Sequence, residues 1–362
     1  MTRPIPQPGI LDIALYKGGK SSVDGVSEVI KLSSNENPFG PSKAAIAAFA
    51  DASMHLHRYP SDSHLELRKA IADNLALDAE RVVIGAGSDE IIAFLCQAFA
   101  GPGDEVLHTE HGFLMYKISA LAAGATPISV PEKSRHTDVD ALLTAITDRT
   151  KIIFVANPNN PTSTFIPLDE IERLANGIPP ETILVLDGAY AEYVDGYDGG
   201  AALVDERENI VMTRTFSKLY GLGGLRVGFG YMPQGIFDAV ARIRGPFNVT
   251  APGLAAAEAA IKDQQYAQYC LDENKTWGQY LTTQLRALGI DVDESFANFV
   301  LARFDTESIA EAANTALMQK GLIVRQVASY NLPNCLRITI GTEENCKAVV
   351  DALKEFMEAQ HG

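Results

Sequence analysis

One lysine stands among hydroxyl and glycine residues in the segment 213–226, which reads TRTFSKLYGLGGLR. An amine attacks a carbonyl carbon only when it is unprotonated, and burial favours that form by lowering the pKa. Lys218 is therefore a candidate nucleophile. Thr215, Ser217 and Arg226 could bind a phosphate together through directed and charge-assisted hydrogen bonds. The segment alone is equally compatible with an ordinary loop lysine and a surface arginine.

A second candidate phosphate site is the segment 84–90, IGAGSDE, which follows an apolar run and precedes the helical period of residues 91–99. Free backbone N–H groups and the positive end of the helix dipole would face an anion there. The string is not G-x-G-x-x-G, and no acidic residue at a later strand end suggests a ribose contact, so a dinucleotide site is disfavoured. Ser88 could also be a simple helix N-cap.

Asn157 and Asp187 each stand at the carboxyl end of an apolar run, where open parallel sheets place ligands. Tyr190 follows Asp187 within one turn. A carboxylate at the end of a buried strand can keep a heterocyclic nitrogen protonated, because it stabilises the cation at short range. An aspartate performs this task in a pyridoxal phosphate site.

The elements that must position these residues are short and alternate in type. Seven apolar runs predict buried strands: 82–84, 105–108, 126–130, 151–155, 182–187, 210–213 and 226–231. Helical periods lie between several of them, so we expect a doubly wound, mostly parallel, seven-stranded α/β sheet. Beyond residue 250 a long helical stretch over 254–288, two further strands and a helix near 308–319 indicate a smaller α+β domain.

This organisation predicts three parts. Residues 1–45, rich in Pro, Gly, Ser and Asn, would form an arm that contributes to the small domain; residues 46–250 would form the large cofactor-binding domain, and residues 251–362 the small domain.

The charge balance and the cysteines exclude several classes of protein. Thirty basic against 46 acidic residues give a net charge of −16, which disfavours a nucleic-acid surface and requires local arginines for any anionic substrate. The four cysteines contain no C-x-x-C pair, which favours a reducing cytoplasm over a disulfide framework. No membrane or targeting segment is expected. His55, His57 and His64 lack the pattern of a defined metal site, and we predict no metal.

Three motifs carry a family resemblance: NPNNPT at 157–162, DGAY at 187–190, and Ser217-Lys218 with Arg226. They resemble the fold-type-I, pyridoxal-phosphate-dependent aminotransferases of class I/II. Four further strings are similar to those of the histidinol-phosphate aminotransferase family: KLSSNENPFGPS at 31–42, RYP at 58–60, GSDE at 87–90 and CLRITIGT at 335–342. The resemblance extends from about Tyr16 to the C-terminal helix.

The resemblance implies roles at the cofactor, pyridoxal 5'-phosphate. Lys218 would bond to the cofactor and shuttle the proton, and Asp187 would pair with the pyridine nitrogen. Asn157 and Tyr190 would donate to the ring hydroxyl, and Phe113 would stack on the ring. The residues of the phosphate cup would be Ala86, Gly87, Ser88, Thr215, Ser217 and Arg226. Tyr59 would reach the cofactor phosphate of a neighbouring subunit, which makes the expected assembly a homodimer.

The resemblance also implies the substrates. Arg337 would pair with a carboxylate, Arg325 with Tyr16 would hold a distal phosphate, and Asn37 would lie at the substrate. The alternation in 336–340 places Arg337 on the face opposite the core, although either arginine could instead be an ordinary surface residue. The expected reaction converts histidinol phosphate and 2-oxoglutarate to imidazole-acetol phosphate and glutamate, in histidine biosynthesis.

Three positions depart from the usual family strings. Phe113 stands where tyrosine is common, Ser163 where glycine is common, and Gly188 replaces an acidic residue. The alternatives therefore remain transamination of phenylalanine or tyrosine, decarboxylation of a phosphothreonine, and a non-catalytic binding module that keeps the fold.

Overall fold

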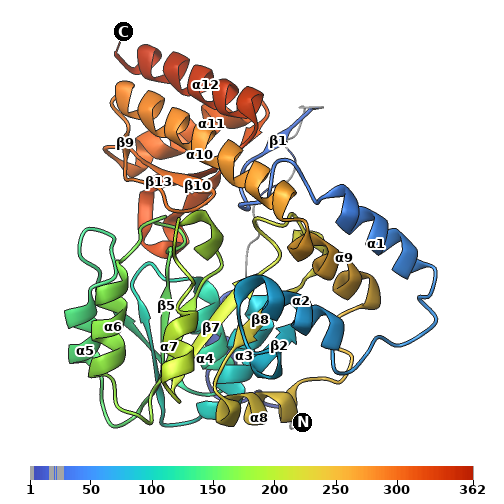
Figure 1. Ribbon diagram of the computed structural model, residues 1–362. Coiled ribbons are helices and arrows are strands. Elements are labelled where there is room, and N and C mark those ends of the chain that lie inside the picture. The colour runs from blue at the N-terminus through green and yellow to red at the C-terminus, as the bar shows by residue number, and fades with distance from the viewer. Residues whose placement is uncertain (1–3, 16–19, 21, 23–27, 362) are drawn as a thin grey trace.

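The computed structural model describes residues 4–15, 20, 22 and 28–361. A seven-stranded sheet forms the larger body, in the order β2-β8-β7-β6-β5-β3-β4, which confirms the expected doubly wound sheet (Figure 1). Its strands are β2 Val82–Gly85, β3 Glu105–Thr109, β4 Thr126–Val130, β5 Thr150–Ala156, β6 Ile183–Asp187, β7 Ile210–Thr215 and β8 Gly228–Tyr231.

The strands β7, β6, β5, β3 and β4 run parallel, whereas β8 is antiparallel to both of its neighbours, β7 and β2. The register pairs Ala156 with Asp187 and Asp187 with Thr213. The ends of β5, β6 and β7 therefore meet at one edge of the sheet, where parallel α/β folds bind ligands.

Both faces of the large sheet are buried at its central strands, which explains why strands such as β5 and β6 are almost continuously apolar. On β5, Ile152 and Phe154 pack into one hydrophobic cluster, and Ile153 and Val155 pack into another on the opposite face. The helices that cover the two faces are α2 Leu65–Leu75, α3 Ser88–Phe99, α4 Leu114–Ala122, α5 Val139–Ala145, α6 Leu168–Gly177, α7 Ala201–Glu206 and α8 Gln234–Ile243.

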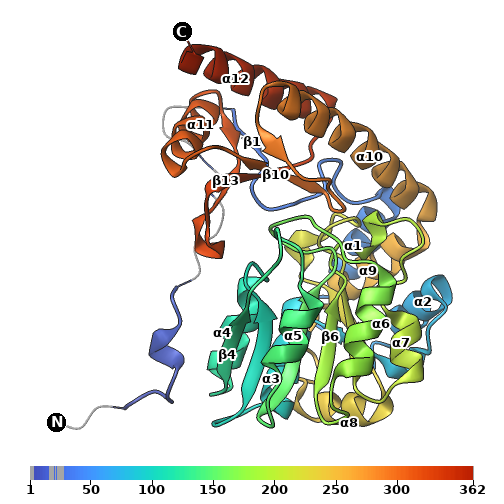
Figure 2. The ribbon, with the colours of Figure 1, turned by 90° about the vertical axis from the view of Figure 1, so that its left-hand side faces the viewer.

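The smaller body contains a four-stranded antiparallel sheet in the order β12-β13-β10-β9, with a hydrophobic core of its own. These strands are β9 Asp291–Val292, β10 Phe299–Arg303, β12 Arg325–Val327 and β13 Leu332–Thr339. The helices α11 Glu307–Gln319 and α12 Glu343–His361 belong to it, and Figure 2 shows α12 and part of α10 lying over the sheet. The N-terminal segment joins this body, because β1 Ile30–Lys31 pairs with β11 Leu322–Ile323.

The helical stretch expected over 254–288 is present, but it is divided into two helices. They are α9 Ala251–Lys262 and α10 Gln264–Ala287. Asp263 separates them with a non-helical ψ of 66°, and its carboxylate accepts the N–H of Tyr266 as an N-cap of α10. The turn lets α9 pack against α1, Lys43–Ser53, in the large body, while α10 continues to the small body.

Candidate active site

A cavity of about 120 Å³ opens near the ends of β5, β6 and β7. It gathers Lys218, Asp187 and Tyr190, which lie in separate elements of the chain. The other lining residues are Ser88, Asp89, Phe113, Ala156, Pro158, Asn160, Ala189, Thr215, Ser217 and Arg226. Most of the expected cofactor residues therefore surround one space.

Lys218 lies shortly after the end of β7, and its side chain is half-buried. Its Nζ donates to the carbonyl of Ser34 at 3.1 Å and lies 5.8 Å from the centre of the Tyr190 ring. Burial, and next the positive charge of Arg337, lower the pKa of Lys218 to about 8. Part of the Lys218 population is consequently present as the unprotonated amine close to neutral pH.

Asp187, at the end of β6, is buried and receives three hydrogen bonds. Tyr116 Oη donates to Oδ2 at 2.7 Å, while Thr213 Oγ1 and the N–H of Ala189 both donate to Oδ1 at 3.2 Å. Burial raises the pKa of Asp187, and the bonds from Tyr116 and Thr213 oppose that shift. The site therefore fixes the orientation of the carboxylate.

Tyr116 is a site residue that the sequence reasoning missed. It is fully buried on α4, stacks on Phe154 at 4.6 Å and meets Phe113 edge-on at 5.9 Å. An aromatic residue at helical spacing is typical of a core position, so only its place three residues after Phe113 could have indicated this contact.

The anion side of the cavity is built around Arg226. Its guanidinium donates to Ser217 Oγ and pairs with Asp89, each at 3.1 Å. Gly87 has a φ of 84°, and a Cβ at that position would lie 2.5 Å from Arg226 Nη2. Glycine is thus required where the backbone approaches the guanidinium. The start of α3 at Ser88 adds free N–H groups beside it.

Two expected cofactor residues also make hydrogen bonds within the protein. The N–H of Ala86 donates to Glu90 Oε2 at 2.7 Å. The amide of Asn157 exchanges two hydrogen bonds with the backbone of Ile166, at 3.0 and 2.9 Å. Asn157 braces the loop, and its neighbours Pro158 and Asn160 line the cavity instead.

Arg337, on β13, brings the small body to this cavity. The side chain is only 7% exposed, and it donates to Asn160 Oδ1 at 2.5 Å and to the carbonyl of Ser33 at 2.8 Å. Arg325 stands directly opposite Arg337 in the β12–β13 register, so both project from one face of the sheet. Arg325 lines a neighbouring apolar cavity of about 340 Å³, together with Leu114 and Lys117.

Three further expected residues lie outside the Lys218 cavity or cannot be placed. Tyr59 is 82% exposed and stacks on Phe247 at 4.7 Å. Asn37 Nδ2 donates to the carbonyl of Leu219 at 2.6 Å, so its amide ties the N-terminal segment to the chain just after Lys218. Tyr16 lies outside the described residues.

Ser163, one of the departures from the family strings, has a φ of 59°. This left-handed conformation explains why glycine is common at the position, since a Cβ is disfavoured there. The strain falls on the loop that carries Asn160, because the N–H of Ser163 donates to the carbonyl of Asn159 at 2.9 Å.

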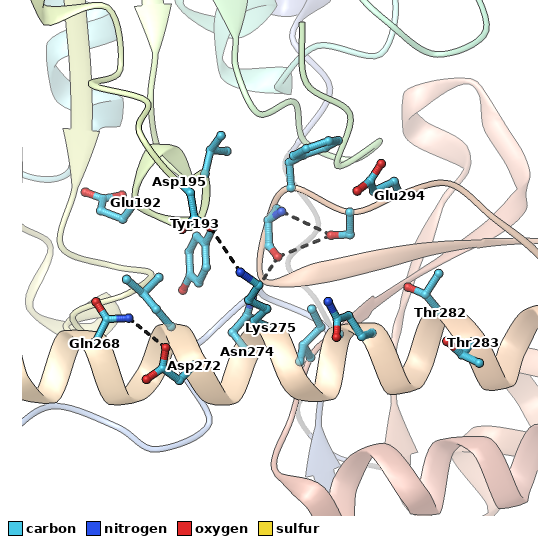
Figure 3. A pocket seen from close by; sticks show the side chains of 18 of the residues that line it. Glu192, Tyr193, Asp195, Gln268, Asp272, Asn274, Lys275, Thr282, Thr283 and Glu294 are labelled. Atoms are coloured by element: carbon cyan, nitrogen blue, oxygen red, sulfur yellow. Dashed lines mark hydrogen bonds and ion pairs between the residues drawn. The ribbon is translucent and has the colours of Figure 1, made fainter. Parts of the chain in front are cut away.

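A larger cavity of about 970 Å³ lies apart from these groups, between α10 and the segments 192–195 and 294–297 (Figure 3). Its lining is about equally polar and apolar. An exposed ion pair between Lys275 and Asp195 joins its two sides at 3.3 Å. Lys218, Asp187 and Arg337 do not line it. We therefore place the chemistry in the smaller cavity.

Across residues 4–15, 20, 22 and 28–361, no three His, Cys, Asp or Glu side chains gather as metal ligands. Within the same part of the chain, no helix is both long and apolar enough to cross a membrane.

Comparison with known proteins places this arrangement in a family. The sequence profile of the family 'Aminotransferase class I and II' matches residues 27–353, and the chain belongs to that family. Within it, the chain belongs with the histidinol-phosphate aminotransferases. It is 62% identical to the enzyme of that name from Ruegeria sp. (strain TM1040) over 98% of both chains, and 60% identical to that of Dinoroseobacter shibae over 98% and 99%.

A solved structure supports the same assignment of the fold. The histidinol-phosphate aminotransferase of Sinorhizobium meliloti, in complex with pyridoxal-5'-phosphate, matches with a TM-score of 0.87 at 27% identity. The match covers 92% of this chain and 91% of the other.

Proposed function

We propose that the chain transfers the amino group of histidinol phosphate to 2-oxoglutarate, giving imidazole-acetol phosphate and glutamate in histidine biosynthesis. The observation that carries the proposal is the desolvated Lys218 amine in one cavity with the Asp187 carboxylate, within reach of the charge of Arg337. The full-length similarity to histidinol-phosphate aminotransferases supports the choice of substrate.

The residues of the cavity fit pyridoxal phosphate, which supplies an aldehyde for the amino group and a ring that accepts electrons. Arg226, Ser217 and the first N–H groups of α3 would hold the phosphate, since the close approach of Arg226 to Gly87 leaves a cradle of donors. Asp187 would keep the ring nitrogen protonated, because its carboxylate is buried and held in orientation by Tyr116. Phe113 offers an aromatic face at the same cavity.

Lys218 is the residue that we assign to proton transfer. Its Nζ accepts a proton from the substrate carbon and returns it, and a pKa near 8 suits both directions around neutral pH. Arg337 contributes to this low pKa, so the substrate-binding residue also tunes the base.

We assign the substrate anions to the two arginines on one face of the small sheet. Arg337 would bind a carboxylate, and Arg325 with Tyr16 would bind the distal phosphate. The chain carries a net charge of −16, so recognition of an anion has to be local. The cross-strand pairing of Arg325 and Arg337 supplies that local positive charge.

We further propose a homodimer in which Tyr59 reaches the partner's cofactor phosphate. Large apolar side chains are exposed on α1 and the turn that follows it: Ile46, Phe49, Met54, Leu56 and Tyr59. Several exposed large apolar side chains on one segment favour its burial against another chain. Mixing inactive Lys218→Ala with inactive Tyr59→Ala chains should restore partial activity, because one hybrid site keeps both residues. Subunit exchange without recovery would contradict the shared site.

The proposal includes a large domain at 46–250 and a small domain at 251–362, to which the arm 1–45 contributes. It also places the enzyme in the cytoplasm, a location that the four buried, unpaired cysteines support.

A donor screen tests the proposed reaction. Purified protein with 2-oxoglutarate is offered histidinol phosphate, phenylalanine, tyrosine or phosphothreonine, and glutamate and carbon dioxide are measured. We expect glutamate with histidinol phosphate above all. An equal rate with phenylalanine or tyrosine would favour an aromatic aminotransferase. Release of carbon dioxide from phosphothreonine would favour a decarboxylase, and the absence of both products would favour a non-catalytic binding module. Borohydride reduction followed by peptide mapping should find the cofactor on Lys218, and a label on another lysine would contradict the site.

A further inference from the structure

Asn35 lies in the segment 33–35, which runs between the two bodies and contacts both. The residue is 1% exposed and adopts a left-handed conformation with a φ of 56°. Its backbone N–H donates to Thr339 Oγ1 at 3.0 Å, and its carbonyl accepts from Asn298 Nδ2 at 2.9 Å. Two residues of the small body therefore fix its backbone.

The side-chain amide of Asn35 points toward Tyr190 and has a defined orientation. Thr339 Oγ1 already accepts the backbone N–H of Asn35, so its own proton is free to go to Asn35 Oδ1, at 3.3 Å. The amide nitrogen is thereby left to face Tyr190, and Nδ2 donates to Tyr190 Oη at 2.8 Å. Asn35 thus acts as a donor toward this phenol.

A phenol oxygen that accepts a hydrogen bond must place its own proton elsewhere. In the described part of the chain, Asn35 is the hydrogen-bond partner of Tyr190 Oη. Because Asn35 donates this bond, the hydroxyl proton of Tyr190 is not part of it. The Tyr190 ring is held edge-on against Phe299 at 5.3 Å, and the residue lines the Lys218 cavity. The hydroxyl proton is consequently available to that cavity.

We propose that Asn35 is a positioning residue that directs the hydroxyl proton of Tyr190 toward the ring oxygen of the cofactor. The inference rests on the proposed function, because it presumes that Tyr190 faces a bound pyridoxal phosphate. Asn35 itself touches neither cofactor nor substrate and acts through Tyr190.

Charged groups from three elements face Tyr190. Lys218 lies under its ring, Arg337 approaches from β13, and Asp187 from the end of β6; the phenol of Tyr330 is also near. Burial raises the pKa of Tyr190 to about 12, so the phenol keeps its proton across the working range of pH. The proton that Asn35 directs is therefore present whenever the enzyme turns over.

The test is the pH midpoint of the visible absorbance of the cofactor-bound enzyme. A hydrogen bond to the ring oxygen stabilises its anion, so losing that bond raises the midpoint. Asn35→Gly tolerates the positive φ and keeps the backbone bonds to Thr339 and Asn298. We expect it to raise the midpoint by about 0.5 to 1 unit, a three- to tenfold change in proton affinity.

A double-mutant cycle distinguishes positioning from a structural role. In a Tyr190→Phe background, Asn35→Gly should leave the midpoint where Tyr190→Phe alone puts it. The matched control, Asn298→Ala, removes the other side-chain bond to Asn35; it should lower the melting temperature without moving the midpoint. Asn35→Asp replaces the donor by an acceptor of the same shape, so it should raise the midpoint at least as far, and it serves if the glycine variant does not fold.

Two results would overturn the inference: an unchanged midpoint in both Asn35→Gly and Asn35→Asp, or the same shift with and without the Tyr190 hydroxyl. Failure of the proposed function would look different, because purified wild-type protein would then show no cofactor absorbance to titrate.

Discussion

Lys218 should destabilise the cofactor-free protein at neutral pH. Its pKa is about 8 in the folded chain against 10.5 for the ordinary value, with burial as the main cause. Below pH 8 the folded state has to hold a buried ammonium, and this cost disappears above pH 10.5. Between these values the unfolded chain binds a proton that the folded chain does not, so stability due to this residue rises with pH.

The magnitude follows from the two pKa values. A difference of about 2.5 pH units corresponds to roughly 3.4 kcal/mol at 1.36 kcal/mol per unit. Lys218→Met removes this titration. Between pH 8 and 10.5 the wild type therefore gains about 3.4 kcal/mol of unfolding free energy that the variant does not gain, and the difference between variant and wild type falls by that amount. With about 2.1 cal/mol/K of unfolding entropy per residue, the change is roughly 4 °C in melting temperature for a chain of this length.

The assay is calorimetry of the cofactor-free proteins at pH 7, 8, 9 and 10. Lys218→Met also loses the hydrogen bond to Ser34, a constant offset that does not depend on pH. Lys262→Met, at an exposed position of α9, controls for the loss of a lysine. A difference between Lys218→Met and wild type that stays flat from pH 7 to 10, or that grows, would refute the argument that burial shifts this amine.

Three further predictions concern the same cavity. Gly87→Ala should weaken cofactor binding at least about tenfold in equilibrium dialysis, because the added methyl group displaces the Arg226 guanidinium and a cost of about 1.4 kcal/mol is enough for a tenfold loss. The control Gly235→Ala, which has nothing near the added methyl group, should leave cofactor binding unchanged. Tyr116→Phe removes from Asp187 a hydrogen bond worth about 1.5–3 kcal/mol, so the cofactor should dissociate faster in stopped-flow absorbance, and an unchanged rate would exclude a supporting role. In single turnover, Arg337→Ala should impair the glutamate half-reaction most, and Arg325→Ala should raise KM for histidinol phosphate but not for phenylalanine; equal losses would argue against separate anion sites.

The sheet could be predicted from sequence because its central strands, such as β5 and β6, are buried on both faces and therefore form nearly continuous apolar runs. The break at Asp263 could not, because the apolar period continues through it and only the capping bond to Tyr266 ends one helix and starts the next. Residue types likewise indicated Lys218 and Asp187, whose chemistry is local.

The partners of these residues were less accessible to sequence reasoning. The Ala86 amide and the Asn157 side chain have the right types for cofactor contacts, and their internal hydrogen bonds to Glu90 and Ile166 are visible only in the folded loops. Tyr116 and Asn35 show the opposite case. The residue type of Tyr116 suggests a core position and that of Asn35 a turn. Only the fold brings Tyr116 to Asp187 and Asn35 to Tyr190. Donor and acceptor pairing across distant segments is a property of tertiary structure.

The segment 33–35 also sets the time at which the site can exist during synthesis. Asn35 and its partner Thr339 are 304 residues apart, so at about 5–20 residues per second the partner leaves the ribosome tens of seconds later. The large sheet, complete by Tyr231, can form before then, but Arg337 and Thr339 arrive only with β13, about 100 residues later. A growing chain therefore presents the Lys218 amine before Arg337, to which we assign the substrate carboxylate, and competence for the reaction has to wait until β13 has been synthesised.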